Sequence, residues 1–304
     1  MRVQRFEHGA GGVTELALDA EGGHLVVGDD AGVLRIWQLG DHPTLLRDVE
    51  PPFTFVDGLD WLADRSGFVA AGPEGIGAWT LDGNPVGSWP TIEAASQSVA
   101  VVDEKHALVA YDDGRLRLID FRAGAVLSEA VAGERNSGIA RHPDGHRFAI
   151  SACDQGGSII CWVTIEGLAL QPLEAGTIER NVDHISAPAV DAGGRMLMAA
   201  DHRLGLFDVG TGRRLHTFDP DGRRSRWRRF ADGLLVEKPW TQCVAVGPSG
   251  LGCASPTGPV YVFDTSTERL AARSDLTSPA TALTADGDVL AAATVDWDLV
   301  LWWP

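Results

Sequence analysis

The sequence predicts an all-β protein, a seven-bladed β-propeller of four-stranded antiparallel blades whose ring is closed by the N-terminal strand in the last blade. The first observation is a unit of three apolar strands and two tight turns, seen first at Leu16–Trp37 and repeated along the 304 residues. A repeat of about 40 to 45 residues is typical of propeller blades. The second observation is that two columns of residues recur in register with this unit.

The first column is the aromatic or apolar residue that ends the third strand of each unit. The steps between its members are 42, 40, 43, 45, 56 and 39 residues by subtraction, along Trp37, Trp79, Ile119, Trp162, Phe207, Phe263 and Trp302. The second column is a small residue in the first strand, where the innermost strands crowd round a common axis. It reads Ala17, Asp60, Ala100, Ala140, Ala189, Ala245 and Ala282, so Asp60 alone departs from alanine.

The two ends of the chain complete one blade between them. The last unit has three strands and no fourth, whereas Val3–Phe6 is a lone strand at the N-terminus. A lone strand needs a partner, and an open sheet edge invites aggregation. We therefore expect Val3–Phe6 to be the outer strand of the last blade. The chain is read as one domain: closing strand and loop 1–12, blades 13–49, 55–87, 96–131, 136–173, 184–218, 240–272 and 278–304, and an insertion at 219–239.

Charge is the unusual bulk property. The chain has 25 Lys and Arg against 42 Asp and Glu, a formal net charge of −17. Phosphate is repelled by such a surface, so bulk nucleic-acid binding is not expected. No apolar run reaches the length of a membrane span or of a signal peptide, and the four cysteines lack a paired C-x-x-C spacing. We expect free thiols, a cytoplasmic location, no membrane contact and a chain that is monomeric when alone.

The repeated unit resembles that of the WD40-repeat β-propellers over essentially the whole chain. The closing aromatic-Asp dipeptide of that family is matched by Phe207-Asp208 and Phe263-Asp264 and, with an apolar residue, by Ile119-Asp120. The other four repeats lack it, and the Gly-His pair expected before the first strand is absent. The resemblance implies a non-catalytic protein that binds proteins or peptides.

Candidate binding residues gather in the turns that a propeller places on one face, here called the top face. The turns between second and third strands carry Asp29, Asp30, Asp112 and Asp113, which predicts an acidic surface for a basic partner. Plain turn chemistry, which favours Asp, explains them equally. Trp89 lies in a predicted connection between blades. It is either an exposed anchor for a partner or a loop residue packed against the protein.

The insertion carries the one basic cluster of the chain. Arginines surround a tryptophan there. One interpretation is a binding patch for an acidic or phosphate-bearing partner. The other is that the arginines fold back on the acidic face and form ion pairs with it. The cluster is Arg223, Arg224, Arg226, Trp227, Arg228 and Arg229.

The central channel offers the second candidate site. Glu15, Asp57, Asp60 and Asn136 fall at or beside the top of their first strands, where oxygen ligands suit Ca²⁺ or simply line a solvated channel. The sequence has no nucleophile elbow, no H-E-x-x-H and no phosphate-binding loop. We therefore expect no enzyme, cofactor or metal, but a protein–protein interaction module acting as scaffold or regulatory subunit. The alternative is a small-molecule hydrolase or ligand-binding propeller with Ca²⁺ in the channel.

Overall fold

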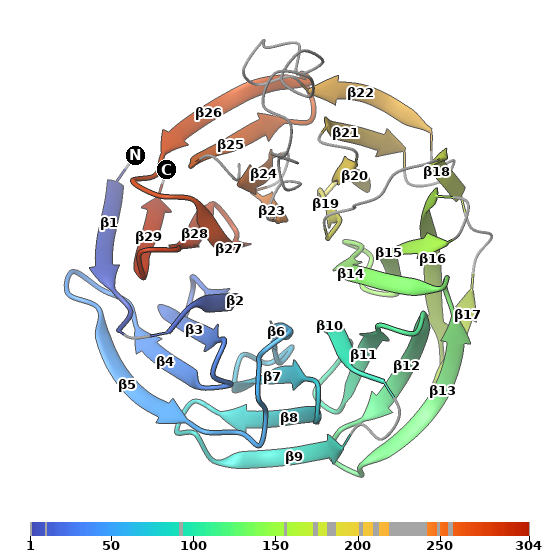
Figure 1. Cartoon of the computed structure of the whole chain (residues 1–304), viewed down its shortest axis with the longest axis horizontal. Helices are drawn as coiled ribbons and strands as arrows, with labels where there is room; N and C mark the ends of the chain where they lie inside the picture. The colour runs from blue at the N-terminus through green and yellow to red at the C-terminus, as the bar shows by residue number, and fades with distance from the viewer. Residues whose placement is uncertain are drawn as a thin grey trace, which may run out of the picture.

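The computed structural model describes residues 2–9, 11–90, 94–154, 157–172, 176–180, 187–200, 203–208, 213–218, 242–247, 250–254 and 258–303. Every element in these ranges is a β-strand. The strands form seven antiparallel sheets arranged as blades round a central axis (Figure 1). The predicted seven-bladed β-propeller is confirmed.

Blades 1 to 3 each contain four consecutive strands that pair in chain order from the axis outward. They are β2 (Val13–Asp19), β3 (His24–Asp29), β4 (Leu34–Gln38) and β5 (Thr44–Val49) in blade 1; β6 (Gly58–Trp61), β7 (Gly67–Gly72), β8 (Gly75–Thr80) and β9 (Pro85–Pro90) in blade 2; and β10 (Ser96–Val101), β11 (His106–Tyr111), β12 (Arg115–Asp120) and β13 (Ala125–Val131) in blade 3.

Blades 4 to 6 follow the same plan, and blade 4 gains a fifth strand, β18, on β16. They are β14 (Arg135–Arg141), β15 (Arg147–Asp154), β16 (Gly157–Glu166), β17 (Ala169–Pro172) and β18 (Gly176–Arg180) in blade 4; β19 (Ala189–Val190), β20 (Arg195–Ala200), β21 (Arg203–Asp208) and β22 (Arg214–Phe218) in blade 5; and β23 (Cys243–Val246), β24 (Gly250–Ala254), β25 (Pro259–Asp264) and β26 (Arg269–Asp275) in blade 6.

Blade 7 is built from both ends of the chain. Its strands β27 (Ala280–Asp286), β28 (Val289–Thr294) and β29 (Asp298–Trp303) are followed outward by β1 (Arg2–Glu7). The two strands pair antiparallel from Arg2 opposite Trp303 to Glu7 opposite Asp298, so the termini lie side by side (Figure 1). The expected closure by the N-terminal strand is confirmed.

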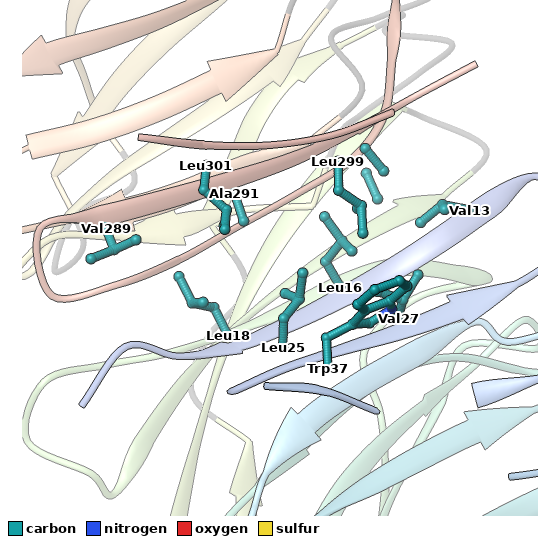
Figure 2. Packing of buried hydrophobic residues seen from close by; sticks show 12 residues of the cluster. Val13, Leu16, Leu18, Leu25, Val27, Trp37, Val289, Ala291, Leu299 and Leu301 are labelled. Carbon is teal, nitrogen blue, oxygen red and sulfur yellow. The ribbon is translucent and has the colours of Figure 1, made fainter. Parts of the chain in front are cut away.

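The hydrophobic core is divided among the seven interfaces between blades. Each blade is covered on both faces, which explains why its middle strands are nearly continuous apolar runs rather than alternating ones. In blade 1, Leu16 and Leu18 face blade 7, whereas Ala17 faces blade 2. Figure 2 shows the first of these interfaces, where Leu25 and Trp37 lie opposite side chains of blade 7. Successive residues therefore serve different interfaces, as the two-residue period of a strand requires.

In blade 4, the residue predicted for the column at the end of the third strand is one position away from the structurally equivalent residue. In blade 1 its member Trp37 pairs with Leu25 and packs toward the preceding blade. The position that pairs equivalently in blade 4 is Val163, opposite Phe148, and not Trp162. Trp162 instead packs with the blade 5 cluster. A shift of one residue turns a strand side chain to the opposite face of its sheet.

The residues predicted for the alanine column occupy equivalent positions in the first strands of blades 1 to 5, but not in those of blades 6 and 7. Ala17 pairs with Val26, and Asp60, Ala100, Ala140 and Ala189 occupy the same place in their sheets. In blade 6 the equivalent residue is Val244, beside Ala245. In blade 7 it is Thr284, two residues after Ala282. The column therefore located every first strand but not the register of each one.

Candidate interaction surface

One face of the ring carries both the turns between second and third strands and the connections between blades. Backbone hydrogen bonds join the two sets directly: Asp30 donates to Gly12, Asp112 to Ala95, and Val295 to Pro279. These contacts define the top face and tie each turn to the entry of its own blade. Side chains on the turns are thereby held on a backbone whose hydrogen bonds are satisfied.

Three of the four predicted acidic turn residues lie on this face. Asp30 is exposed, and its Oδ1 accepts a hydrogen bond of 3.1 Å from the Gly12 amide. Asp112 and Asp113 are also exposed. Asp113 accepts a hydrogen bond of 2.5 Å from Nε of Arg115. Burial raises the pKa of the Asp113 carboxyl, but the bonds from Arg115 outweigh it and leave that pKa below its usual value. Asp30 and Asp112 have no ion pair within the described residues, so both can meet a basic group from outside.

Asp29 is placed inside the protein rather than on the docking surface. It is only 1% exposed, and its Oδ1 accepts from the amides of Ala31 and Val33. Its Oδ2 accepts from Arg35 at 2.7 Å, and the same arginine nitrogen lies 3.1 Å from Nε2 of His8. His8 directly follows β1, so this cluster joins the closing strand to blade 1. Burial, and then Arg35, lower the pKa of His8 to about 4.

Glu15 and Asp57, two of the four predicted channel residues, lie close enough to interact electrostatically. Burial raises the pKa of Glu15 to about 8, opposed by a 3.3 Å hydrogen bond from the Gln242 amide and reinforced by Asp57. Burial also raises the pKa of Asp57 to about 6, with added repulsion from Glu74 and Asp112. Gln242 is fixed in turn, because its Oε1 accepts from the Leu283 amide at 2.6 Å. Asp57 thus disfavours the ionised form of Glu15.

The other two predicted channel residues form bonds between blades. Asp60 accepts from its neighbour Trp61 at 2.8 Å and from Val101 of blade 3 at 2.7 Å. Burial raises the pKa of Asp60 to about 6, although the hydrogen bonds from these two amides act in the opposite direction. Asn136 is 4% exposed, and its amide donates to the Arg115 carbonyl of blade 3. Asp60 therefore takes the alanine position because it caps an amide of the next blade.

These channel groups do not assemble a metal site. Among the residues that the structure describes, no group of three or more His, Cys, Asp or Glu side chains is placed to hold a metal ion. Ca²⁺ needs six to eight oxygen ligands, so the carboxylates of Glu15 and Asp57 alone fall well short. Three of the cysteines, Cys161, Cys243 and Cys253, are buried free thiols, as expected for side chains that serve as small apolar groups.

Trp89 lies in the outer strand β9 rather than in a connection between blades. It is partly buried against the cluster between blades 2 and 3, and its ring approaches Gly124 of blade 3. This favours the packed interpretation over the interface anchor. The predicted basic cluster, Arg223, Arg224, Arg226, Trp227, Arg228 and Arg229, lies outside the described residues.

The structure adds an apolar pair that the sequence reading missed. Val295 and Trp297, in the turn between β28 and β29, are 49% and 48% exposed. Trp297 has a φ of 69°, in the left-handed region that large side chains rarely adopt. Its carbonyl accepts from the His8 amide, which places the turn beside the end of β1 on the top face. The signal in the sequence is a tryptophan between two aspartates inside a predicted turn.

The fold and this face define the class of protein: a seven-bladed β-propeller with an acidic top face. Comparison with the models of known protein families and with curated proteins finds no match to the chain. Within the described ranges, no helix has the length and apolar character needed to cross a membrane.

Glu15 predicts how stability changes with pH. Its pKa is raised in the folded state, so the folded protein binds more protons than the unfolded chain between about pH 4.5 and 8, and stability falls as pH rises through that window. Asp57 and Asp60 make stability fall with rising pH in the same way, but only up to about pH 6. The lowered pKa of His8 makes stability rise with pH, and this effect is confined to pH values below 6.5. Between pH 6.5 and 8.5 we expect urea denaturation to show a loss of about 1–2 kcal/mol.

The matched variants isolate this effect. Glu15→Gln keeps an acceptor for Gln242 but cannot ionise, so its stability should be nearly constant from pH 6.5 to 8.5. Glu21→Gln changes an exposed carboxyl of the same blade and should follow the parent protein. Equal pH slopes for the parent and Glu15→Gln would show that Glu15 does not control this window.

Proposed function

We propose that this chain is a non-catalytic protein–protein interaction module, a divergent propeller of the WD40-repeat kind, that binds a basic partner on its top face. The observation that carries the proposal is the set of exposed top-face carboxylates that no cation of the described chain neutralises: Asp30, Asp112 and Asp296. A formal net charge of −17 adds a long-range field that steers a basic partner toward the protein.

Rigidity of the face supports the same proposal. The turns that hold Asp30 and Asp112 bond to the backbone of the connections beside them, and each blade packs a buried apolar cluster against both neighbours. A pre-organised surface loses little entropy when a partner binds. Hydrogen bonds such as Thr14 to the Val56 carbonyl and Ser96 to the Gly72 carbonyl further join neighbouring blades at this end.

Two variants of equal charge test the proposal. The top-face variant carries Asp30→Asn, Asp112→Asn and Asp296→Asn; the control carries Glu21→Gln, Asp82→Asn and Asp288→Asn, all exposed and on the opposite side of the ring. Both remove three negative charges. We expect proteins captured from the native host by the tagged parent chain to be lost or weakened about tenfold or more with the top-face variant and retained with the control.

Equal capture by the two variants would contradict the proposal, because a general effect of net charge does not depend on which face is changed. Melting temperatures of both variants, measured beside the parent, confirm that any loss is not unfolding. The channel alternative is separated by titrating Ca²⁺ and chelator: a site that binds Ca²⁺ raises the melting temperature by mass action, whereas the interaction module is indifferent to both.

A further inference from the structure

The exposed turn of blade 7 combines an apolar centre with a negative border. Val295 and Trp297 are each about half exposed. Asp296 between them is exposed, and Asp298 next to them is partly exposed. Tryptophan is over-represented among the residues that dominate interface energies, because its ring offers a large rigid contact area. We use the name Trp297 patch for Val295 and Trp297 together with the four carboxylates described below, Glu7, Asp30, Asp296 and Asp298.

The border extends across the closing seam into blade 1. Glu7, opposite Asp298 in the pairing of β1 with β29, is exposed. The next residue, His8, bonds the Trp297 carbonyl through its amide and contacts Arg35, which is bonded to Asp29; exposed Asp30 follows. Arg35 is already engaged with Asp29 and Asp48. Exposed Arg5 also lies on β1, two residues before Glu7.

Four exposed or partly exposed carboxylates extend from this turn across the seam, and none of them has an ion pair with a cation of the described chain. These residues are Glu7, Asp30, Asp296 and Asp298. Two exposed apolar side chains alone would fit many partners, and carboxylates alone would fit any cation. Together they select a segment that brings an apolar side chain to the centre and cations to the border, since charge complementarity fixes both the partner and its register.

From this juxtaposition we propose that the Trp297 patch binds a partner segment in which an aromatic side chain is flanked by arginines. The proposal rests on the proposed function and names the chemistry of its partner. The aromatic side chain packs on Val295 and Trp297, and the guanidinium groups pair with Asp296, Glu7 and Asp30. Arginine suits this role because its planar group bonds carboxylates in a fork and also stacks on aromatic rings.

A peptide of defined sequence serves as the probe. The stretch DGRRSRWRRFA, residues 221–231 of this chain, has an arginine-flanked tryptophan. Labelled peptide is titrated with the full chain and followed by fluorescence anisotropy, at low and at physiological salt. A second peptide with serine in place of the tryptophan has the same charge and measures attraction by net charge alone. We expect the tryptophan peptide to bind about tenfold or more tightly than the serine peptide.

Protein variants locate the binding. Trp297→Gly removes the ring and leaves a residue that accepts the left-handed turn, and Asp296→Asn removes a border charge. We expect each to weaken the tryptophan peptide about tenfold, and the advantage over the serine peptide to vanish with Trp297→Gly. Leu168→Ala, in the exposed turn between β16 and β17 on the opposite face, should bind like the parent chain. Melting temperatures verify folding.

Three results would overturn the inference. Equal affinity for the two peptides would leave only net charge, and binding that ignores Trp297→Gly would place the peptide elsewhere. In a third variant, the arginines of residues 223–229 are replaced by serine. If this variant binds the peptide more tightly than the parent chain, the chain's own arginine stretch competes for the patch and is its occupant, in place of a separate partner. Each is distinct from failure of the proposed function, which is decided by partner capture with the top-face variant.

Discussion

Deletion of residues 1–8 is expected to lower the free energy of unfolding by roughly 3–5 kcal/mol and to cause self-association. β1 provides the outer strand of blade 7, and without it β29 presents an unpaired edge. Phe6 also contacts Trp37 of blade 1, with ring centroids 5.1 Å apart, so its loss opens the interface between the first and last blades. The deletion therefore removes both a strand ladder and a core contact.

Polar contacts across the same seam add to this loss. Gln4 donates to the carbonyls of Gly40 and Asp41 at 3.0 Å, and Arg2 pairs with Asp41 at 2.8 Å. The ion pair is exposed and contributes little. Buried His8 contributes more, because its contact with Arg35 joins the end of β1 to blade 1.

The measurement is urea denaturation followed by tryptophan fluorescence, with size-exclusion chromatography for association. Arg5→Ser is the matched control, because Arg5 is exposed on the same strand and should change stability by no more than about 0.5 kcal/mol. A truncated chain that remains monomeric with an unchanged denaturation midpoint would show that β1 does not close the ring in solution.

Substitution of Gly114 by alanine is expected to destabilise the protein by about 2–5 kcal/mol. Gly114 has a φ of 82° in the turn between β11 and β12, a conformation that costs an L-residue about 1–2 kcal/mol. A Cβ there would also overlap the backbone carbonyl of Gly133, in the connection to blade 4. Backbone cannot move aside as a flexible side chain can, so overpacking adds about 1–3 kcal/mol.

Gly167→Ala separates the two causes. Gly167 has a similar φ of 63°, but a Cβ at this position meets no atom within 4 Å. Its substitution should therefore cost only the conformational strain, about 1–2 kcal/mol. Equal denaturation midpoints for the two variants would show that the close approach of Gly114 to Gly133 has no energetic weight.

The acidic surface shows where sequence reasoning stops. Asp29 and Asp30 are neighbours in one turn, yet Asp29 is buried with Arg35 and Asp30 is exposed. Alternation along the chain could suggest that their side chains diverge, but only the packing of β1 and His8 over this turn decides which is covered. Trp297 shows the converse, since an aromatic side chain is about half exposed in its turn instead of buried.

The sequence by itself determined the seven blades and the closing strand, because a local repeat of strand and turn chemistry is written in consecutive residues. Tertiary structure alone decided the one-residue register that turns Trp162 toward blade 5, and the placement of Asp60 and Asn136 in bonds between blades. These features depend on contacts between residues about 20 to 40 positions apart, where a shift of one residue exchanges the two faces of a sheet.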